Sequence, residues 1–505
     1  MASPVPVRSE IDRGESTCLP DSRYRPRSDL DEAVDRDLQP RPPYRGLWKF
    51  LSKLAPELWE DRQRAAAEEL LHRGVTFAVD AKSEDRVFPL DLLPRILSAS
   101  EWLHIEKGLI QRMTALNCFL RDVYTQARIL HEGVIPAELV LGSPQFRREM
   151  VGAPPPHGVH AAIAGSDLLR LRDGFVVLED NLRVPSGASY MLANRRVLRR
   201  VFPSLFQVGP VASIETYPTL LREALFALRP EAARRDLAVM LTPGIHNPAY
   251  FEHAFLAHEM GIPLAEGKDL AVIEGKVQLR TASGWKAVGT IYRRLNDDFL
   301  DPVAFRPDSL LGVPGLVAAC RARRVSVVNA IGTGVADDKA LYPFVPSMIR
   351  YYLGEDPILP SVETFLCERP AERDHVLGNL KKLVVKEVSQ AGGYGMLFGP
   401  TSSARERASF RDKILAQPRS YIAQPVLSFS QVPCWIDGRL QPRRIDLRPF
   451  VLFGPAPMVI PGGLTRVALR EGSFIVNSCQ GGGSKDTWVL RADKHDGRRQ
   501  PPPSS

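Results

Sequence analysis

From residue 160 onward, the chain consists of short apolar runs broken by Gly, Asp and Pro. Short apolar runs with such boundaries are typical of β-strands. Longer helical stretches lie between some of these runs, at 250–261 and 341–354. The strand-like runs themselves lie at 167–171, 175–179, 237–244 and 383–388. Because strands and helices are interleaved, the pattern predicts an α/β or α+β protein.

The segment before residue 160 has a different pattern. Residues 44–145 are expected to be mainly helical, since Ser98 and Glu101 have the spacing of a capping box. The apolar residues that follow recur at helical spacing and predict a core-facing stripe; they are Leu109, Met113, Leu116, Leu120 and Val123. Residues 1–43 and 491–505 are rich in Pro, Arg, Asp and Ser without an apolar period, so both are predicted to be disordered tails.

Composition excludes several classes of protein. The chain is 44% hydrophobic and 25% charged, which argues against a wholly disordered, collagen-like or disulfide-scaffold protein. The net charge of +8, from 66 basic and 58 acidic residues, permits an anionic ligand but does not indicate a nucleic-acid-coating protein. The six cysteines are widely spaced, which favours reduced thiols in a cytoplasmic protein. Neither a signal peptide nor a membrane span is predicted.

The sharpest local signal is the segment 165–187, which is predicted to form a β-hairpin. A three-residue loop at 172–174 would place Asp167 opposite Glu179, with Asn181 on the same face. Three such oxygen-bearing side chains would suit a hard cation such as Mg²⁺. A two-residue loop at 173–174 would shift the register and separate the acids. An exposed hairpin with ordinary surface acids is the alternative interpretation.

A second signal follows the strand-like run at 383–388. Lys386 is followed by a loop that carries Gly392, Gly393 and Gly395. Glycines let backbone N–H groups approach phosphate oxygens, and a lysine adds a positive charge. The alternative is a tight turn without a ligand. The chain contains no P-loop motif.

A third signal lies between residues 421 and 488. Asp446 and Arg448 alternate along one predicted strand, and Arg466 and Asn477 follow on later ones. Arginine is a planar bidentate donor suited to phosphate. The alternative for each arginine is a surface salt bridge with a neighbouring acid.

Together these segments resemble the ATP-grasp fold in a circularly permuted order. The metal-binding hairpin, which usually ends such a domain, here precedes the lysine, the glycine loop and the arginine strands. More narrowly, the chain resembles the circularly permuted ATP-grasp type 2 family over about residues 45–490. The motifs that carry this resemblance include GSDLLRLRDGFVVLEDNLRVPSGASYML, VVKEVSQAGGYGM, RIDLRPFVL and VNSCQGGGSKDTWVL. Glutathionylspermidine synthetases are more distantly similar, with ADDKALYPF and its Lys339 resembling their lysine region.

The resemblance implies an α+β protein. It would combine a circularly permuted ATP-grasp fold, with antiparallel sheets and an ATP cleft, an α/β pre-ATP-grasp-like domain and an N-terminal helical region. The expected boundaries are a disordered tail at 1–43, a helical region at 44–145, the metal-binding half at 146–210, the α/β substrate-side domain at 211–340, the nucleotide-binding half at 341–490 and a tail at 491–505.

The activity implied by the resemblance is an ADP-forming carboxylate–amine ligase that uses ATP and Mg²⁺. A carboxylate on a small peptide or amino acid would be activated as an acyl-phosphate and attacked by an amine. The alternatives are a nucleotide-binding pseudoenzyme or scaffold within a peptide-modifying system, with partner proteins, and a nucleic-acid-binding protein. The absence of an aromatic and basic stripe argues against the last.

Residue roles follow from the same resemblance. The catalytic candidates are Arg466, Arg448 and Asn477. The metal ligands would be Asp167, Glu179 and Asn181. The nucleotide would be bound by Lys386, Gly392, Gly393, Gly395, Lys339 and, beside the adenine, Gln424. Arg183 and Arg294 are expected to face the substrate carboxylate. Asp297 and Asp298 would attract the amine, or would form a local ion-pair cluster.

Overall fold

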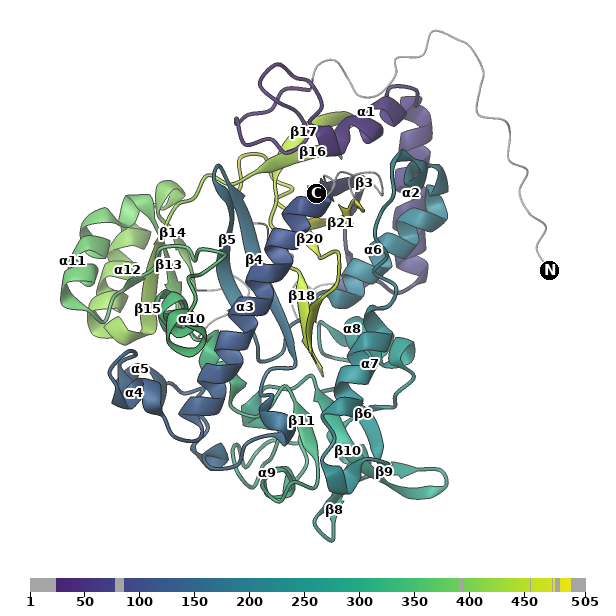
Figure 1. Cartoon of the computed structure of the whole chain (residues 1–505). Coiled ribbons are helices and arrows are strands. Elements are labelled where there is room, and N and C mark those ends of the chain that lie inside the picture. Colours follow the sequence, from purple (N-terminus) through teal and green to yellow (C-terminus); the bar gives the residue numbers. More distant parts are fainter. Residues whose placement is uncertain are drawn as a thin grey trace, which may run out of the picture.

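A four-stranded antiparallel sheet, in the order β19-β18-β4-β5, lies at the centre of the protein (Figure 1). The computed structural model describes residues 24–77, 86–389, 395–454, 456–474, 476 and 482–491. The strands of this sheet are β4 (Ile163–Leu171), β5 (Gly174–Asn181), β18 (Phe450–Phe453) and β19 (Pro457–Val459). Because β18 pairs directly with β4, with Val451 opposite Ala164, segments almost 300 residues apart in sequence share one sheet. This pairing joins the two halves of the permuted arrangement.

A three-stranded sheet brings the N-terminal and C-terminal parts of the chain together. Its order is β20-β21-β3, with β21 parallel to β3 and antiparallel to β20. The strands are β3 (Leu90–Leu97), β20 (Thr465–Val467) and β21 (Gly483–Val489). All eight residues of β3 are buried, so its sequence lacks the alternation that marks a half-exposed strand. The expectation of a mainly helical 44–145 region therefore missed this strand.

The helix α3 (Ala99–Val123) packs across β18 and β19 and is the longest helix in Figure 1. Ser98 and Glu101 form the predicted capping box, and the predicted apolar stripe is buried. The other helices of the central body lie mostly around its edges. They are α1 (Arg45–Leu51), α2 (Pro56–His72), α4 (Arg128–His131), α5 (Ala137–Leu141), α6 (Ala188–Val201) and α10 (Val345–Leu353).

A separate mixed sheet occupies the segment expected to form the substrate-side α/β domain. Its path is β7-β6-β10-β9-β8, with β11 also paired to β10. Its strands are β6 (Leu237–Leu241), β7 (Leu264–Ala265), β8 (Leu270–Ile273), β9 (Lys276–Thr281), β10 (Gly284–Arg293) and β11 (Ser326–Val328). Its helices are α7 (Tyr217–Ala227), α8 (Tyr250–Met260) and α9 (Leu316–Arg321). The β6, β7 and β11 pairings are parallel and the β8 and β9 pairings antiparallel.

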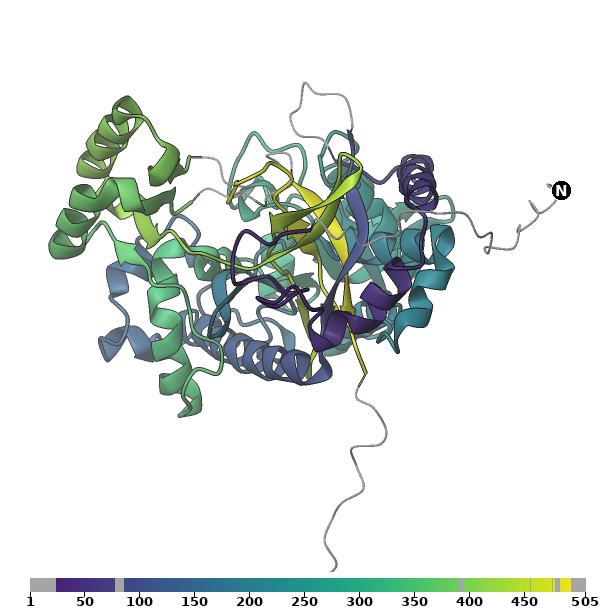
Figure 2. The same ribbon diagram turned by 90° about the horizontal axis from the view of Figure 1, so that it is seen from above.

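A small lobe projects from one side of the body, as Figures 1 and 2 both show. Its antiparallel sheet has the order β12-β15-β13-β14 and carries two helices. The elements are β12 (Phe365–Leu366), α11 (Pro370–Asn379), β13 (Leu383–Glu387), β14 (Leu397–Phe398), α12 (Ala404–Ala416) and β15 (Tyr421–Pro425). The lobe has its own buried cluster, which includes Val376, Val385 and Ile414. Leu366 and Ile422 of the lobe belong to the core cluster of the body, so the two are also packed together.

The prediction of a disordered tail over residues 1–43 is wrong for residues 24–43, which pack onto the body. Ala33 and Val34 are buried, and a backbone bridge joins Asp31 to Gln431. The Glu32 carboxylate accepts hydrogen bonds from Arg95 at 2.5 and 2.9 Å, with both side chains buried. The polar composition of this segment predicted disorder. The segment is ordered because its charged side chains pair with buried partners on the body, which composition does not reveal.

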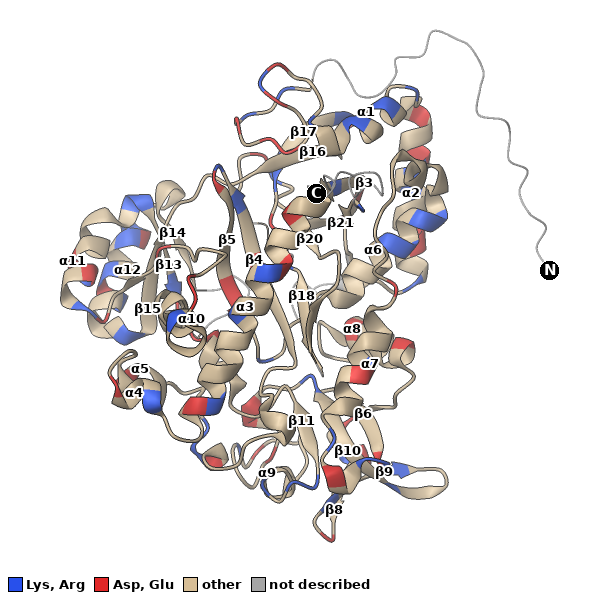
Figure 3. Cartoon of the chain, viewed as in Figure 1, with Lys and Arg blue, Asp and Glu red and all other residues tan. Residues whose placement is uncertain are grey.

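Two hairpins complete the described elements, β1 (Thr76–Phe77) with β2 (Arg86–Val87), and β16 (Gln431–Ile436) with β17 (Arg439–Arg444). Both signs of charge are interspersed over the surface helices, as Figure 3 shows. The described helices include none with the length and apolarity needed to cross a bilayer. The predicted tail at 491–505 lies, apart from residue 491, outside the described residues.

Candidate functional site

The β4–β5 hairpin places Asp167, Glu179 and Asn181 on one face of the central sheet. Asp167 pairs with Glu179, as predicted, and Gly165 pairs with Asn181. The predicted three-residue loop is wrong, because Leu171 pairs with Gly174 around a two-residue turn. An irregularity between residues 167 and 168 of β4, opposite Leu178, restores the register.

Asp167 lies in a buried network of two carboxylates and two guanidinium groups. Arg448 donates to both of its oxygens, at 2.5 and 2.8 Å, and Arg466 donates to one at 2.6 Å. Arg466 also donates through Nε to both oxygens of Asp446, at 3.1 and 2.9 Å. Burial would raise the pKa of Asp167, but the charges of Arg448 and Arg466 hold it well below its ordinary value. Asp167 is therefore ionised and fully paired.

Glu179 and Asn181 have the donor chemistry that Mg²⁺ prefers. Both line a pocket on the face of the hairpin, and the Asn181 amide nitrogen donates to the Gly165 carbonyl, so its amide oxygen is left for a ligand. Carboxylate and amide oxygens fit a hard cation. Asp167 fits less well, because both of its oxygens accept from arginines. Among the residues that the structure describes, no cluster of three His, Cys, Asp or Glu is arranged for a metal.

Lys386 reaches this region from the small lobe. It lies on β13, and its Nζ donates to the Gln424 amide oxygen on neighbouring β15 at 2.8 Å. Burial lowers the pKa of Lys386, and nearby Lys339 lowers it further, whereas Glu179 and Asp167 raise it. Lys386 is therefore close enough to Glu179 and Asp167 for their charges to act on it.

The side chain of Gln424 accepts a hydrogen bond from Lys386 and so positions its amine. Its side chain is buried, and its amide nitrogen donates to the Thr364 hydroxyl at 2.9 Å while its oxygen accepts from Lys386. Both ends of the amide are engaged, so Gln424 positions Lys386, and its expected place beside the adenine stays a prediction. Gly395 has φ +66°, a left-handed conformation that favours glycine. The predicted Gly392 and Gly393 lie outside the described residues.

The pocket has about 50 Å³ of space that a water-sized molecule can reach, and about 530 Å³ of empty space when the open solvent at its mouth is included. Four predicted residues from three roles line it: Glu179, Asn181, Arg183 and Lys339. The other lining residues come from two segments of the body, 144–145 and 334–342, and from the two residues that follow β13; they are Pro144, Gln145, Gly334, Asp337, Asp338, Tyr342, Val388 and Ser389.

Sequence reasoning missed Gln145, Asp337 and Asp338 as part of the site. Gln145 accepts a hydrogen bond from Arg183 at 2.9 Å and so orients that guanidinium. The Asp337 carboxylate accepts from the backbone N–H of Leu182 and Arg183, at 2.6 and 3.2 Å. Burial raises the pKa of Asp337 to about 6, although Arg183 opposes the shift. The ADDKALYPF motif contains both aspartates, but only its lysine was assigned a role.

The expectation that Arg294 faces a substrate carboxylate is wrong. Its side chain is buried and paired with Glu252 at 2.8 Å. It also donates to the Pro185 carbonyl at 2.7 Å, which fixes the turn that follows the hairpin. Burial explains the difference, because a buried guanidinium needs a carboxylate of its own.

Asp297 and Asp298 form the ion-pair cluster that was the alternative to an amine site. Asp297 is fully buried and pairs with Arg293 at 2.7 Å. Asp298 pairs with Arg147 at 2.6 Å. Both carboxylates are paired with neighbouring arginines, so the structure favours the ion-pair cluster over an amine-binding site. Asn477, the remaining catalytic candidate, lies outside the described residues.

Comparison with solved structures gives the class of fold. A glutathione synthetase-like effector from Globodera pallida, in its apo form, superposes with a TM-score of 0.52. The match covers 86% of this chain and 98% of that one, at 10% sequence identity. At this identity the likeness is one of fold alone.

Comparison of sequences gives the family. The profile of the family described as circularly permuted ATP-grasp type 2 matches residues 94–468. An uncharacterized protein of Synechocystis sp. is 50% identical over 472 residues, which are 93% of this chain and 98% of that protein. The chain therefore belongs to the circularly permuted ATP-grasp type 2 family, as its motifs predicted.

A third relative carries a functional name. The Frankia casuarinae protein named "Putative glutamate--cysteine ligase 2-2" is 43% identical over 474 residues, which are 93% of this chain and 54% of that protein. Membership of the ATP-grasp family supports an ATP-dependent ligase, and enzymes of this family generally use ATP and Mg²⁺.

Proposed function

We propose that this protein is an ATP-dependent, ADP-forming carboxylate–amine ligase that acts on an amino acid or small peptide through an acyl-phosphate. The observation that carries the proposal is the composition of the pocket. The cations Arg183 and Lys339 line it together with the oxygen ligands Glu179 and Asn181, and the end of the Lys386 strand reaches it through Val388 and Ser389. Such a site can hold two anions, a phosphate and a carboxylate, close together.

The chemistry has two steps. The γ-phosphoryl group passes from ATP to the substrate carboxylate, so that an acyl-phosphate and ADP form. The amine nitrogen then attacks the acyl carbon; the amide bond forms, phosphate leaves with the bonding electrons, and the amine loses a proton. The protein need not supply a nucleophile, because both reacting groups belong to substrates.

In this proposal each pocket residue has a separate task. Lys386 and Lys339 bind the nucleotide phosphates, and Arg183 binds the substrate carboxylate. Glu179 and Asn181 would hold Mg²⁺, which supplies positive charge at the phosphoryl oxygens when bound.

The buried arginines have the remaining task. Arg466 and Arg448 are proposed to stabilise charge on the transferred phosphoryl group, with Asn477 as a further contact. For this they must exchange part of their pairing with Asp167, which in turn would free Asp167 oxygens for the metal. The small-substrate class is supported by the functional name of the Frankia relative.

The second candidate function is a nucleotide-binding scaffold within a larger peptide-modifying system, with protein partners. One observation favours it, namely that both Asp167 oxygens are occupied by guanidinium groups. If this pairing persists with nucleotide present, the third metal ligand is lost and phosphoryl transfer is disabled.

The experiment separates binding from chemistry. Lys386→Ala removes a charge-assisted contact of roughly 1.5–3 kcal/mol, so ATP affinity by calorimetry should fall about ten- to a hundredfold. Glu179→Gln should spare Mg²⁺-free nucleotide binding and suppress ADP formation with a panel of amino acids. Lys381→Ala, at an exposed lysine of the same lobe, is the matched control and should bind ATP as the wild type does.

The outcomes discriminate between the two functions. Loss of ADP formation in Glu179→Gln with intact nucleotide binding supports the ligase. ATP binding without ADP formation from any carboxylate and amine pair supports the scaffold. A wild-type protein that binds no ATP with or without Mg²⁺ refutes both.

A further inference from the structure

Two consecutive aspartates on the pocket wall contact opposite parts of the molecule. Asp337 ends the short helix η8 (Thr333–Asp337), and Asp338 precedes the short helix η9 (Lys339–Phe344). Asp337 contacts the end of β5, whereas Asp338 contacts the small lobe. Lys339, which lines the pocket, follows them directly. The pair therefore lies where the body, the pocket and the lobe meet.

Asp337 fixes the body side of the pocket. Its two oxygens accept the N–H groups of Leu182 and Arg183, the residues that follow Asn181. These contacts hold the chain at the point where it leaves β5. The position of Arg183 and of the oxygen ligands on β5 therefore depends on Asp337.

Asp338 fixes the lobe side. Its side chain is 4% exposed and accepts from Arg419 at 2.8 Å, from the Ser143 hydroxyl at 3.0 Å and from the Ala340 N–H at 3.0 Å. Arg419 also donates to the Leu139 carbonyl of α5 at 3.0 Å. One guanidinium group of the lobe thus contacts two separate segments of the body.

Arg419 is close to Lys386 along the lobe's sheet. It lies in the short helix η12 (Pro418–Ser420), which leads directly into β15. There, Ile422 pairs with Lys386 of β13, and Gln424 holds the lysine amine. A displacement of Arg419 relative to the body would therefore be transmitted to Lys386 by strand pairing.

We propose that the Asp338–Arg419 ion pair sets the orientation of the small lobe and so positions Lys386 over the pocket, while Asp337 positions the opposite wall. Both aspartates and Arg419 are positioning residues, since they act through Lys386, Arg183 and β5. The inference rests on the proposed function for its catalytic consequence. The contact between lobe and body stands independently of that function.

The test combines a nucleotide assay with a distance measurement. Arg419→Met should weaken ATP binding about tenfold, and Arg419→Lys, which keeps the charge opposite Asp338, should recover most of it. In an Lys386→Ala background, Arg419→Met should have little additional effect, because both changes act on one contact. Arg411→Met is the control, since Arg411 is exposed and its guanidinium group donates to the Leu377 carbonyl within the lobe.

The distance measurement needs no nucleotide. Fluorophores introduced with unnatural amino acids at Leu103 on α3 and Leu415 on α12, both about half exposed, report the orientation of the lobe by energy transfer. Arg419→Met should broaden the distance distribution, whereas Arg411→Met and Arg419→Lys should not. Thermal melts identify any variant that has unfolded.

The outcomes separate this inference from the proposed function. An unchanged distance distribution together with unchanged ATP affinity in Arg419→Met overturns the positioning role. Additive losses in the double variant also overturn it. If the wild type binds no ATP but Arg419→Met still broadens the distribution, the ligase proposal fails and the structural role of the ion pair is supported.

Discussion

Replacing Arg466 by methionine tests the buried charge network directly. Arg466 is 9% exposed in its side chain and lies between Asp167 and the fully buried Asp446. Asp167 keeps Arg448 as a partner in the variant, but the Asp446 carboxylate loses the guanidinium group that neutralises it. Removing one partner of a buried ion pair typically costs about 3–5 kcal/mol, because a charge is left uncompensated.

The loss of folding stability in Arg466→Met should be larger at high pH than at low pH. Burial raises the pKa of Asp446 in the wild type although Arg466 opposes the shift, so removing Arg466 raises that pKa further. Stability of Arg466→Met relative to wild type should therefore fall as pH rises from the wild-type pKa of Asp446 toward the higher pKa in the variant, by at most ~1.4 kcal/mol per unit. Removing both charges, in Asp446→Asn with Arg466→Met, should recover most of the loss.

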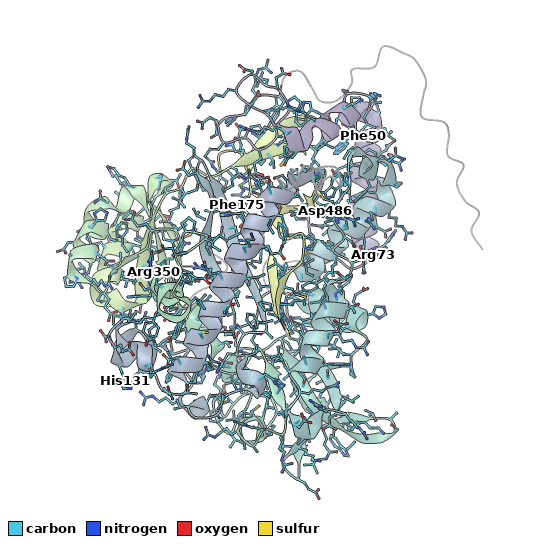
Figure 4. All side chains as sticks on the ribbon, viewed as in Figure 1. Phe50, Arg73, His131, Phe175, Arg350 and Asp486 are labelled. Atoms are coloured by element: carbon cyan, nitrogen blue, oxygen red, sulfur yellow. The ribbon has the colours of Figure 1, made fainter. Side chains whose placement is uncertain are left out.

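Urea unfolding followed by tryptophan fluorescence at pH 5 and pH 8 measures these differences. The control is Arg350→Met on α10, labelled in Figure 4, whose ion pair with Asp356 is exposed and should contribute less than about 1 kcal/mol. If Arg466→Met unfolds at the same urea concentration as wild type, or if the double variant is no better than the single one, the network does not stabilise the fold as argued.

Three further predictions concern other buried groups. Burial, together with nearby positive charge, lowers the pKa of His160 to about 4. Acidification from about pH 6.5 should therefore destabilise the wild type by up to ~1.4 kcal/mol per pH unit. In urea titrations, His160→Phe should remove this contribution to the pH dependence. A methyl group on Gly334 would lie 3.0 Å from the Arg183 side chain, so Gly334→Ala should raise the KM for the carboxylate substrate by up to about a hundredfold. Gly378→Ala, where a methyl group meets nothing within 4 Å, is its control and should leave the KM unchanged. Glu32→Gln should lower the free energy of unfolding by about 3 kcal/mol, since it leaves the buried Arg95 without its carboxylate. An unchanged urea midpoint would contradict the assignment of residues 24–43 to the fold.

Local features of the fold could be predicted from the sequence because their causes lie within a few residues. The helix α3 begins at its capping box and buries the stripe that its periodicity indicated. That Glu179 and Asn181 share one face of the sheet followed from the alternation of side chains along a single strand. The family followed from the order and content of the motifs.

A distant segment contacts the hairpin next to its register irregularity. Val177 of β5 donates to the Pro360 carbonyl and accepts from the Val362 N–H, so the strand is held on its outer edge by a distant segment. The strand is fixed there, next to the register irregularity opposite Leu178. A one-residue change in loop length is thus compensated within the same strand, and the final register is the same.

The partners of charged residues were decided only by the tertiary structure. Asp167 and its two arginines are 281 and 299 residues apart, and Arg294 pairs with Glu252 through a contact between separate elements. The sequence determined which residue types could bind phosphate, metal and carboxylate. It could not determine which of these charges neutralise one another, because that depends on which side chains are buried together, and burial is a property of the packed chain.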